Sequence, residues 1–141
     1  SHPYCIRRLS HCKMYRKIAI LSLACLLGTA SGAAVDLNKE NFDAQVYDSG
    51  KHAFVKFFAP WCGHCKSMAG AWGELGTEYQ DHSTVLIADV DCTQQQSVCG
   101  DHGVRGYPSL KYFKAGNKVP ESYSGGRSKE ALKSFIETTL V

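Results

Sequence analysis

Three short runs of apolar residues divide the middle of the chain and predict buried β-strands. The first lies at 53–59 and is apolar except for Lys56, the second lies at 85–90 and is apolar except for Asp89, and the third lies at 110–113 and contains Lys111. Continuous apolar runs of this length are typical of strands that are covered on both faces of a sheet. Two weaker strands are expected at 35–37 and 119–123.

Apolar residues at helical spacing predict four helices around these strands. The longest is expected at 62–79, a short one at 93–101, and the first and last begin at the N-cap residues Asn38 and Ser128. The core-facing residues are Phe42, Val46, Met68, Trp72, Leu75, Tyr79, Leu132, Phe135, Ile136 and Leu140. Strands that alternate with helices and end in a hairpin and a helix predict an α/β fold, with a central mixed β-sheet flanked by helices.

Length and composition indicate a single domain with a substantial core. The chain has 141 residues, of which 44% are hydrophobic, and its formal net charge is +3. Five of the basic side chains stand at positions 1–17, where there is no acidic one, and without them the net charge is −2. Charge therefore gives no reason to expect a nucleic-acid or membrane-surface partner. We expect His52, His82 and His102, which stand among polar residues, to be solvated.

The N-terminal stretch at 1–34 resembles a targeting segment. An apolar run of about ten residues follows Arg16 and Lys17 and precedes a stretch of small residues, as in a secretory signal peptide. The run is too short to span a bilayer, which needs about 20 residues. We interpret 14–34 as the signal peptide, 1–13 as an upstream or non-native extension, and 35–141 as the mature domain.

Two cysteines stand between the first central strand and the longest helix. Cys62 and Cys65 are separated by Gly63 and His64, and a Cys-x-x-Cys at this position in a strand–helix unit is typical of a redox site. A sulfur at a helix N-terminus faces unpaired N–H groups, which favour the thiolate. We therefore expect Cys62 to be the nucleophile and Cys65, one turn later, to be the resolving cysteine. A protonated His64 would add positive charge, and Gly63 permits a close turn.

Two motifs give the chain a specific resemblance. Ala-Pro-Trp-Cys-Gly-His-Cys-Lys at 59–66 is similar to the active-site motif of protein disulfide isomerase catalytic domains. Gly-Val-Arg-Gly-Tyr-Pro at 103–108 is similar to their second motif. The resemblance extends from about Val35 to the C-terminus and implies the thioredoxin fold.

The second motif implies further site residues. In the family, the bond before the proline that matches Pro108 is cis, and the residue that matches Tyr107 offers its backbone to an extended substrate. The resemblance gives Arg105 the role of approaching and stabilising the Cys65 thiolate transiently; the alternative is an ordinary surface arginine. Trp61 is expected to offer an apolar surface to unfolded substrates, or else to pack in the core.

One pair of charges departs from the family pattern. The family usually carries a buried glutamate six residues before the first cysteine, where this chain has Lys56, and a lysine on the next strand, where it has Asp89. Because an unpaired buried charge is costly, we expect Lys56 and Asp89 to form an ion pair. We hypothesise that Asp89 supplies the carboxylate for proton transfer with Cys65. The alternative is a structural ion pair without a catalytic role.

Cys92 and Cys99 lie outside the first motif. On sequence alone they could be free thiols, a metal-binding pair or a second disulfide. Zinc held by all four mature cysteines would occupy Cys62 and Cys65 and abolish the redox site. Some relatives carry a structural disulfide in the same Asp-Cys-Thr context, and this resemblance implies a structural Cys92–Cys99 disulfide. We expect no metal site.

The motifs predict a thiol–disulfide oxidoreductase or isomerase that forms or rearranges disulfides in secretory-pathway proteins. A thioredoxin-type reductase is the first alternative, although His64 stands where such reductases usually have proline. A chaperone or binding module with little redox activity is the second.

The same reading predicts partners and location. No cofactor is needed. We expect folding secretory proteins as substrates, an unidentified protein that reoxidises or reduces the site, no nucleic acid, and a monomer. The signal segment predicts that the protein enters the secretory pathway. We expect it in the lumen of the endoplasmic reticulum or secreted, and secretion stays open because this sequence ends without a retrieval motif.

Overall fold

A five-stranded mixed sheet forms the centre of the molecule. The computed structural model describes residues 34–141, so the expectations for 1–13 and for nearly all of 14–34 lie outside the described residues. The sheet has the order β1–β3–β2–β4–β5. The strands β1, β3 and β2 are parallel to one another, β4 is antiparallel to β2, and β5 is antiparallel to β4. The strands are β1 (Val35–Asp36), β2 (His52–Phe58), β3 (Val85–Asp91), β4 (Ser109–Phe113) and β5 (Glu121–Tyr123). The predicted mixed sheet is confirmed.

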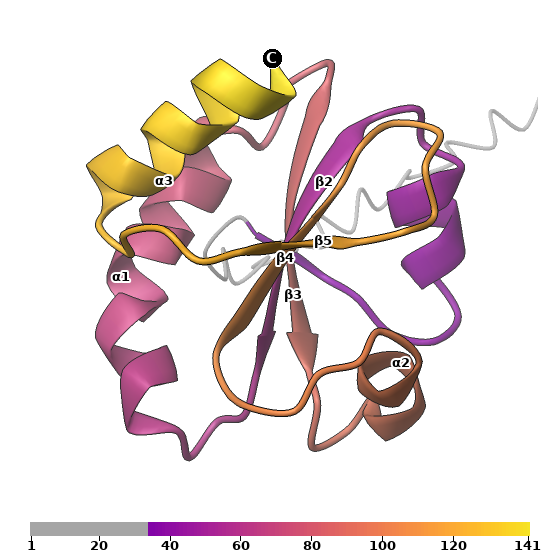
Figure 1. Cartoon of the computed structure of the whole chain (residues 1–141), viewed down its shortest axis with the longest axis vertical. Helices are drawn as coiled ribbons and strands as arrows, with labels where there is room; N and C mark the ends of the chain where they lie inside the picture. Colours follow the sequence, from indigo (N-terminus) through magenta and orange to yellow (C-terminus); the bar gives the residue numbers. More distant parts are fainter. Residues whose placement is uncertain (1–33) are drawn as a thin grey trace, which may run out of the picture.

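Helices cover both faces of this sheet (Figure 1). α1 (Gly63–Glu78) and α3 (Lys129–Phe135), the latter continued by the π-helical turn η2 (Ile136–Leu140), lie on one face. The π-helical turn η1 (Asp43–Tyr47) and α2 (Gln96–Asp101) lie on the other. None of the described helices combines the length and the apolar character needed to cross a membrane.

Side chains of the central strands alternate between two hydrophobic layers. On β2, Val55 and Phe57 pack towards η1 and α2, whereas Phe54 packs towards α1 and α3. Trp72 of α1 is completely buried in the second layer. Because both faces of β2 and β3 are covered, their sequences are continuous apolar runs, as expected of central parallel strands. Lys56 and Asp89 interrupt these runs, and Lys56 lies on the α1 side of β2, where its ammonium group faces the Trp72 ring.

The elements predicted at 93–101 and 119–123 begin later than expected. α2 begins at Gln96 instead of residue 93, because the Asp91 carboxylate accepts hydrogen bonds from the Thr93 N–H and hydroxyl groups and holds a turn there. β5 begins at Glu121 instead of residue 119, because Pro120 has no N–H to contribute to the sheet.

One of the two N-cap predictions is confirmed. Ser128 is the N-cap residue of α3, and its Oγ accepts a hydrogen bond from the Ala131 N–H, which the first turn leaves free. Asn38 is not the N-cap residue of η1, which begins later, at Asp43, after Phe42. Asn38 Oδ1 instead accepts hydrogen bonds from the N–H groups of Glu40 and Asn41 in the turn before η1.

Three segments meet at the carboxyl ends of β2 and β3. The start of α1 follows β2 directly, α2 follows β3, and the loop from α2 into β4 passes beside them (Figure 1). Because β2 and β3 are parallel, residues just beyond their ends lie at the same edge of the sheet. This edge carries both sequence motifs.

Candidate functional site

Cys62 is the N-cap residue of α1. The chain leaves β2, and the Cys62 N–H donates a 3.1 Å hydrogen bond to the Ala59 carbonyl, which closes the turn before the helix. The Cys62 backbone is extended, and its sulfur accepts a 3.4 Å hydrogen bond from the Cys65 N–H. This is the position that the strand–helix pattern predicted. Both cysteines are free thiols and are largely buried, with 8% of Cys62 and 4% of Cys65 exposed.

Hydrogen bonds around the Cys62 sulfur favour its thiolate. The Cys65 thiol lowers the pKa of Cys62 most strongly, and the N–H groups of Cys65 and His64 lower it further against the opposing effect of burial. The positive charge of Arg127 acts in the same direction. His64 contributes here through its backbone, and its side chain is exposed to solvent.

Cys65 has the opposite character. Burial raises the pKa of Cys65, and its hydrogen bond to Cys62 raises it further because the Cys65 hydrogen is needed to stabilise the Cys62 thiolate. The charge of Lys56 opposes this rise. The two neighbouring thiols are thus unequal: Cys62 loses its proton more readily, whereas Cys65 holds it.

The second motif lies against Cys62. The Tyr107–Pro108 peptide bond is cis, and Pro108 is buried. The Cys62 thiol donates a 3.5 Å hydrogen bond to the Tyr107 carbonyl oxygen. A substrate chain that bound to this carbonyl would have to displace the Cys62 contact.

Trp61 provides an exposed apolar surface beside the cysteines. Its side chain is 70% exposed, and its ring meets the Tyr107 ring edge-on with 5.9 Å between the ring centroids. Trp61 is therefore not a core residue, which removes the packing alternative. An aromatic pair of an exposed Trp61 and a half-buried Tyr107, next to the Cys62 sulfur, can contact an apolar segment of another chain.

Two arginines differ in their relation to the cysteines. Arg105 is exposed, and its side chain makes no hydrogen bond or ion pair with the rest of residues 34–141. Arg127, in the loop between β5 and α3, is the arginine whose charge acts on Cys62. Sequence reasoning missed Arg127, because it lies far beyond Cys62 in the sequence and outside both motifs.

Lys56 and Asp89 form the expected ion pair. They stand opposite each other on the parallel strands β2 and β3, and Lys56 Nζ lies 3.2 Å from Asp89 Oδ1. Only 7% of the Lys56 side chain and 17% of the Asp89 side chain are exposed. Lys56 Nζ also lies 5.1 Å from the ring centroid of Phe58 and 5.5 Å from that of Trp72. These contacts compensate in part for removing the ammonium from water.

Asp89 is held in a poorly solvated site. Burial raises the pKa of Asp89, although the Lys56 ammonium opposes the rise. Within the described part of the chain, Asp89 Oδ1 and the indole nitrogen of Trp72 are buried polar atoms that lack a hydrogen-bond partner.

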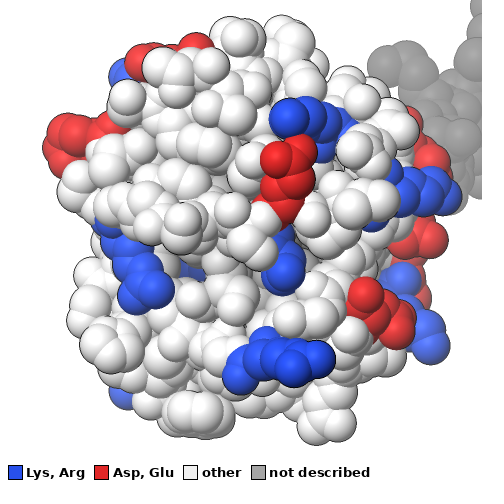
Figure 2. Space-filling view, in the orientation of Figure 1, with Lys and Arg blue, Asp and Glu red and all other residues white. Residues whose placement is uncertain are grey.

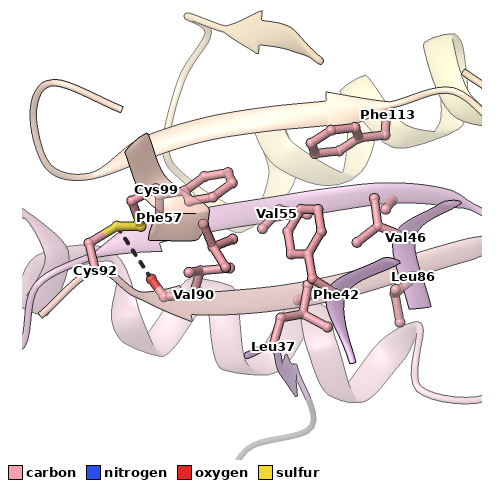
Figure 3. Close-up of a cluster of buried hydrophobic side chains, with 13 residues drawn as sticks. Leu37, Phe42, Val46, Val55, Phe57, Leu86, Val90, Cys92, Cys99 and Phe113 are labelled. Carbon is pink, nitrogen blue, oxygen red and sulfur yellow. Dashed lines mark hydrogen bonds between the residues drawn. A yellow bond between two sulfur atoms is a disulfide. The ribbon is translucent and has the colours of Figure 1, made fainter. Parts of the chain in front are cut away.

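Cys92 and Cys99 are joined by a disulfide that ties α2 to the segment just after β3. Both residues are buried beside Phe57 and Val90 in the layer that faces α2 (Figure 3). Because these sulfurs are bonded to each other, neither the free-thiol nor the metal-pair alternative describes this structure.

The expectation that His102 is solvated is wrong. Its ring packs against the rings of Phe42, Phe57 and Phe113, at centroid distances of 4.6, 5.8 and 5.5 Å. Its Nε2 lies 2.8 Å from the Tyr47 hydroxyl oxygen, and its Nδ1 lies 2.6 Å from the Val98 carbonyl oxygen. The sequence neighbours of His102 are polar, but the end of α2 turns its ring into the core.

The fold and the site geometry agree with comparisons to known proteins. The sequence profile of the thioredoxin family matches residues 33–138. The chain belongs to the thioredoxin family. Among curated relatives of this thioredoxin-family chain, protein disulfide-isomerase-like protein EhSep2 of Emiliania huxleyi is 49% identical over 121 residues, which are 85% of this chain and 54% of that protein. The probable protein disulfide-isomerase A6 of Medicago sativa is 39% identical over 130 residues, 89% of this chain and 35% of that one.

Solved structures give the same family. The J-Trx1 fragment of ERdj5 superposes with a TM-score of 0.66 at 35% identity, over 75% of this chain and 49% of that fragment. The first thioredoxin domain of mouse protein disulfide-isomerase A4 superposes with a TM-score of 0.66 at 29% identity, over 76% of this chain and 75% of that domain. The thioredoxin-family chain thus spans about half or less of the length of the curated relatives described above.

Proposed function

We propose that this chain is a thiol–disulfide oxidoreductase of the protein disulfide isomerase type. The observation that carries the proposal is the inequality of two adjacent thiols: Cys62 is activated at the N-terminus of α1, whereas Cys65 is buried and protonated one turn later. Thiol–disulfide exchange needs a thiolate that attacks and a second thiol that resolves the product. The named relatives support the same chemistry.

The two cysteines act in sequence. The Cys62 thiolate attacks a substrate disulfide, so that a Cys62–substrate bond forms, the substrate S–S bond breaks and one substrate sulfur leaves as a thiolate. Cys65 then loses its proton and attacks the Cys62 sulfur, which closes the Cys62–Cys65 disulfide and releases the second substrate thiolate. The reverse sequence oxidises a substrate dithiol. If the released thiolate attacks elsewhere before Cys65 does, the substrate disulfide is rearranged.

The surface around Cys62 suits an extended or unfolded protein segment. The exposed Trp61 ring contacts the half-buried Tyr107 ring, and the Tyr107 backbone before Pro108 lies beside the reacting sulfur. We propose that these three residues bind the substrate and that the exposed Arg105 side chain approaches Cys65 when its thiolate forms. Gly63 and His64 complete the turn between the cysteines.

The proposed location follows from the N-terminal stretch at 1–34 and from the relatives. We propose that 14–34 is a signal peptide and that the domain at 35–141 acts in the endoplasmic reticulum or after secretion. Folding secretory proteins are the proposed substrates, an unidentified redox protein is the proposed partner, and the domain is proposed to be a monomer without nucleic acid. Acidic and basic side chains are interspersed on the face shown in Figure 2, which favours no single charged partner there.

The experiment that tests the proposal is alkylation of reduced protein by iodoacetamide as a function of pH. Cys62 is expected to react with a midpoint below the ordinary thiol pKa of about 8.5, and Cys65→Ser is expected to accumulate a stable mixed disulfide with glutathione. If Cys62 reacts only above that pH and no mixed disulfide forms with glutathione disulfide, the proposal is wrong.

The reduction potential separates the proposed function from a thioredoxin-type reductase. Equilibration with glutathione is expected to give a potential near −180 mV, the approximate value for protein disulfide isomerase. A potential near −270 mV, the approximate value for thioredoxin, would favour a reductase.

A further inference from the structure

Three exposed basic side chains border the cysteine site. Lys66 directly follows Cys65 in α1, and both residues line a cavity of about 110 Å³. Arg105 belongs to the second motif, whose loop contacts Cys62, and the charge of Arg127 acts on the same thiol. All three side chains are exposed, and none of them forms an ion pair with the rest of the described residues. Their charges are therefore available to a molecule that approaches the site.

Acidic residues are absent from the sequence segments that form this border. There is no aspartate or glutamate at 59–73, 102–120 or 124–129. The first acidic residue of α1 is Glu74, which lies about 18 Å further along the helix than Cys62, at a rise of about 1.5 Å per residue. Asp101 at the end of α2 and Glu130 in the first turn of α3 flank these segments. Neither forms an ion pair with the three basic side chains.

The carboxylates at this edge of the sheet lie on its other side. Asp36, Asp89 and Asp91 line a cavity of about 340 Å³ at the ends of β1 and β3. In the strand order β1–β3–β2–β4–β5, the segments with the basic side chains follow β2, precede β4 and follow β5. The edge is thus divided into an acidic part and a basic part, and the cysteines belong to the basic part. This edge is at the bottom of Figure 1, so the mixed charges on the face in Figure 2 do not describe it.

The basic side chains determine which charges can approach the Cys62 thiolate. A thiolate alone repels the carboxylates of another chain, because both are negative. Three exposed cations outnumber this single charge, and charges of one sign at a site raise the local concentration of ligands of the opposite sign. The net charge of residues 35–141 is −2, so any attraction of an acidic partner is confined to the site.

We propose that the site selects substrate segments in which aspartate or glutamate residues flank the reacting cysteine. This inference rests on the proposed thiol–disulfide exchange and names its substrate class. Carboxylates of the segment lie beside Lys66, Arg105 and Arg127, while its apolar residues contact Trp61. The Cys62 thiolate attacks one sulfur of the substrate disulfide. The Cys62–substrate bond forms, the substrate S–S bond breaks, and the leaving substrate sulfur takes the electron pair of that bond.

The test compares symmetric disulfide dimers of three short peptides. Each peptide contains Phe-Cys, and the residues on either side of this pair are Glu, Gln or Lys. The reduced chain is mixed with each dimer at pH 7, and formation of the Cys62–Cys65 disulfide is followed by alkylation and mass spectrometry. Each rate constant is divided by that of the same dimer with mercaptoethanol, so that the intrinsic reactivity of the dimer cancels.

The expected result is a preference that depends on charge and on salt. At low ionic strength the Glu dimer is expected to react about tenfold faster than the Lys dimer, because electrostatic steering changes association rates by about 10–10³-fold. The Gln dimer is expected to lie between them. We call the quotient of the Glu and Lys rate constants the charge ratio. It is expected to fall towards one in 0.5 M salt, where exposed charges are screened over a few ångströms.

Single substitutions locate the preference. Lys66→Gln, Arg105→Gln and Arg127→Gln are each expected to lower the charge ratio about twofold, as three equal contributions to steering predict. Lys118→Gln is the matched control, because Lys118 is also exposed but follows β4, at the end of that strand away from the site. Its charge ratio is expected to equal that of wild type. The ratio is the readout because a loss of Cys62 reactivity slows all three dimers alike.

The outcomes separate this inference from the proposed function. The inference is overturned if wild type has a charge ratio near one at low ionic strength, if salt leaves the ratio unchanged, or if Lys118→Gln lowers it as much as the substitutions at the site do. If all three dimers oxidise the chain at equal rates, only the substrate class is wrong. If none of them forms the Cys62–Cys65 disulfide, the proposed function itself fails.

Discussion

The Lys56 ammonium lies 3.2 Å from Asp89 Oδ1, and the two residues depend on each other unequally. Lys56 also faces the rings of Phe58 and Trp72, which can retain the cation if the carboxylate is lost. Burial disfavours the ionised form of Asp89, and Lys56 is the main group that opposes this effect. Removing the lysine should therefore lower the free energy of unfolding more than removing the aspartate.

Unfolding by urea tests this asymmetry. Lys56→Met is expected to lower the free energy of unfolding at pH 7 by about 3 kcal/mol, because it leaves a buried carboxylate without its counter-charge. Asp89→Asn is expected to cost about 1 kcal/mol or less, and the double variant is expected to be more stable than Lys56→Met. Equal losses for the two single variants would show that neither charge has another partner.

The pH dependence of stability follows from the raised pKa of Asp89. The folded chain keeps a proton on Asp89 to higher pH than the unfolded chain, whose carboxyl has a pKa of about 3.9. The contribution of this group to stability is therefore fully present below about pH 3.9 and is lost as the pH rises through the folded pKa. Urea unfolding from pH 3.5 to 7 is expected to show wild type losing stability relative to Asp89→Asn as the pH increases. The opposite slope would mean that ion pairing outweighs burial at Asp89.

The Cys92–Cys99 disulfide is expected to contribute to stability without serving catalysis. It closes a short loop, with a sequence separation of 7 residues, and both sulfurs are buried. The double variant Cys92→Ala/Cys99→Ala is expected to lower the free energy of unfolding by about 2–3 kcal/mol. Attack of Cys62 on glutathione disulfide should be unchanged in conditions where the variant is folded. Urea unfolding of fully reduced wild type is the matched control, because it opens the disulfide without removing side-chain atoms. If the double variant and reduced wild type both keep the urea midpoint of oxidised wild type, the prediction is wrong.

Sequence could predict those parts of the site that lie close together along the chain. Cys62 could be placed at a helix N-terminus because an apolar strand ends just before it and a helical stripe begins just after it. Lys56 and Asp89 could be paired because each is a charge in a strand that is otherwise buried, so each needed a partner. The strand–helix pattern left few other positions for Cys62, and the cost of an unpaired buried charge left few other partners for Lys56 and Asp89.

The parts that sequence missed depend on contacts between distant segments. Arg127 reaches Cys62 only because the loop before α3 returns to that end of the sheet. His102 is polar and has polar neighbours, but Phe42 and Tyr47 of the first helical region and Phe113 of β4 surround it. The alignment of Asp36 with Asp89 is set by strand order and register, which hydrophobic pattern alone does not determine.

The contact between Tyr47 and His102 makes a prediction about the layer beside α2. The Val98 carbonyl can only accept a hydrogen bond, so Nδ1 of His102 carries the hydrogen and, in the neutral ring, Nε2 accepts from the Tyr47 hydroxyl. Tyr47→Phe leaves this partly buried nitrogen without a donor and is expected to lower the free energy of unfolding by about 1–2 kcal/mol. Tyr112→Phe is the matched control, because its hydroxyl donates to the exposed Glu121 carboxylate. If Tyr47→Phe lowers the free energy of unfolding no more than Tyr112→Phe does, the prediction is wrong.

The last prediction separates the two arginines near the cysteines. Arg127 lowers the pKa of Cys62, whereas the exposed side chain of Arg105 makes no ion pair or hydrogen bond within residues 34–141 in this reduced state. Arg127→Ala is therefore expected to shift the alkylation midpoint of Cys62 to higher pH, and Arg105→Ala is expected to leave that midpoint unchanged. If Arg105 approaches Cys65 only when its thiolate forms, Arg105→Ala should instead slow the release of glutathione from Cys62. Repeating the alkylation in 0.5 M salt should weaken the effect of Arg127, because an exposed charge is screened over a few ångströms at that ionic strength. A shift caused by Arg105→Ala, or none caused by Arg127→Ala, would contradict the assignment of Arg127 as the arginine that lowers the pKa of Cys62.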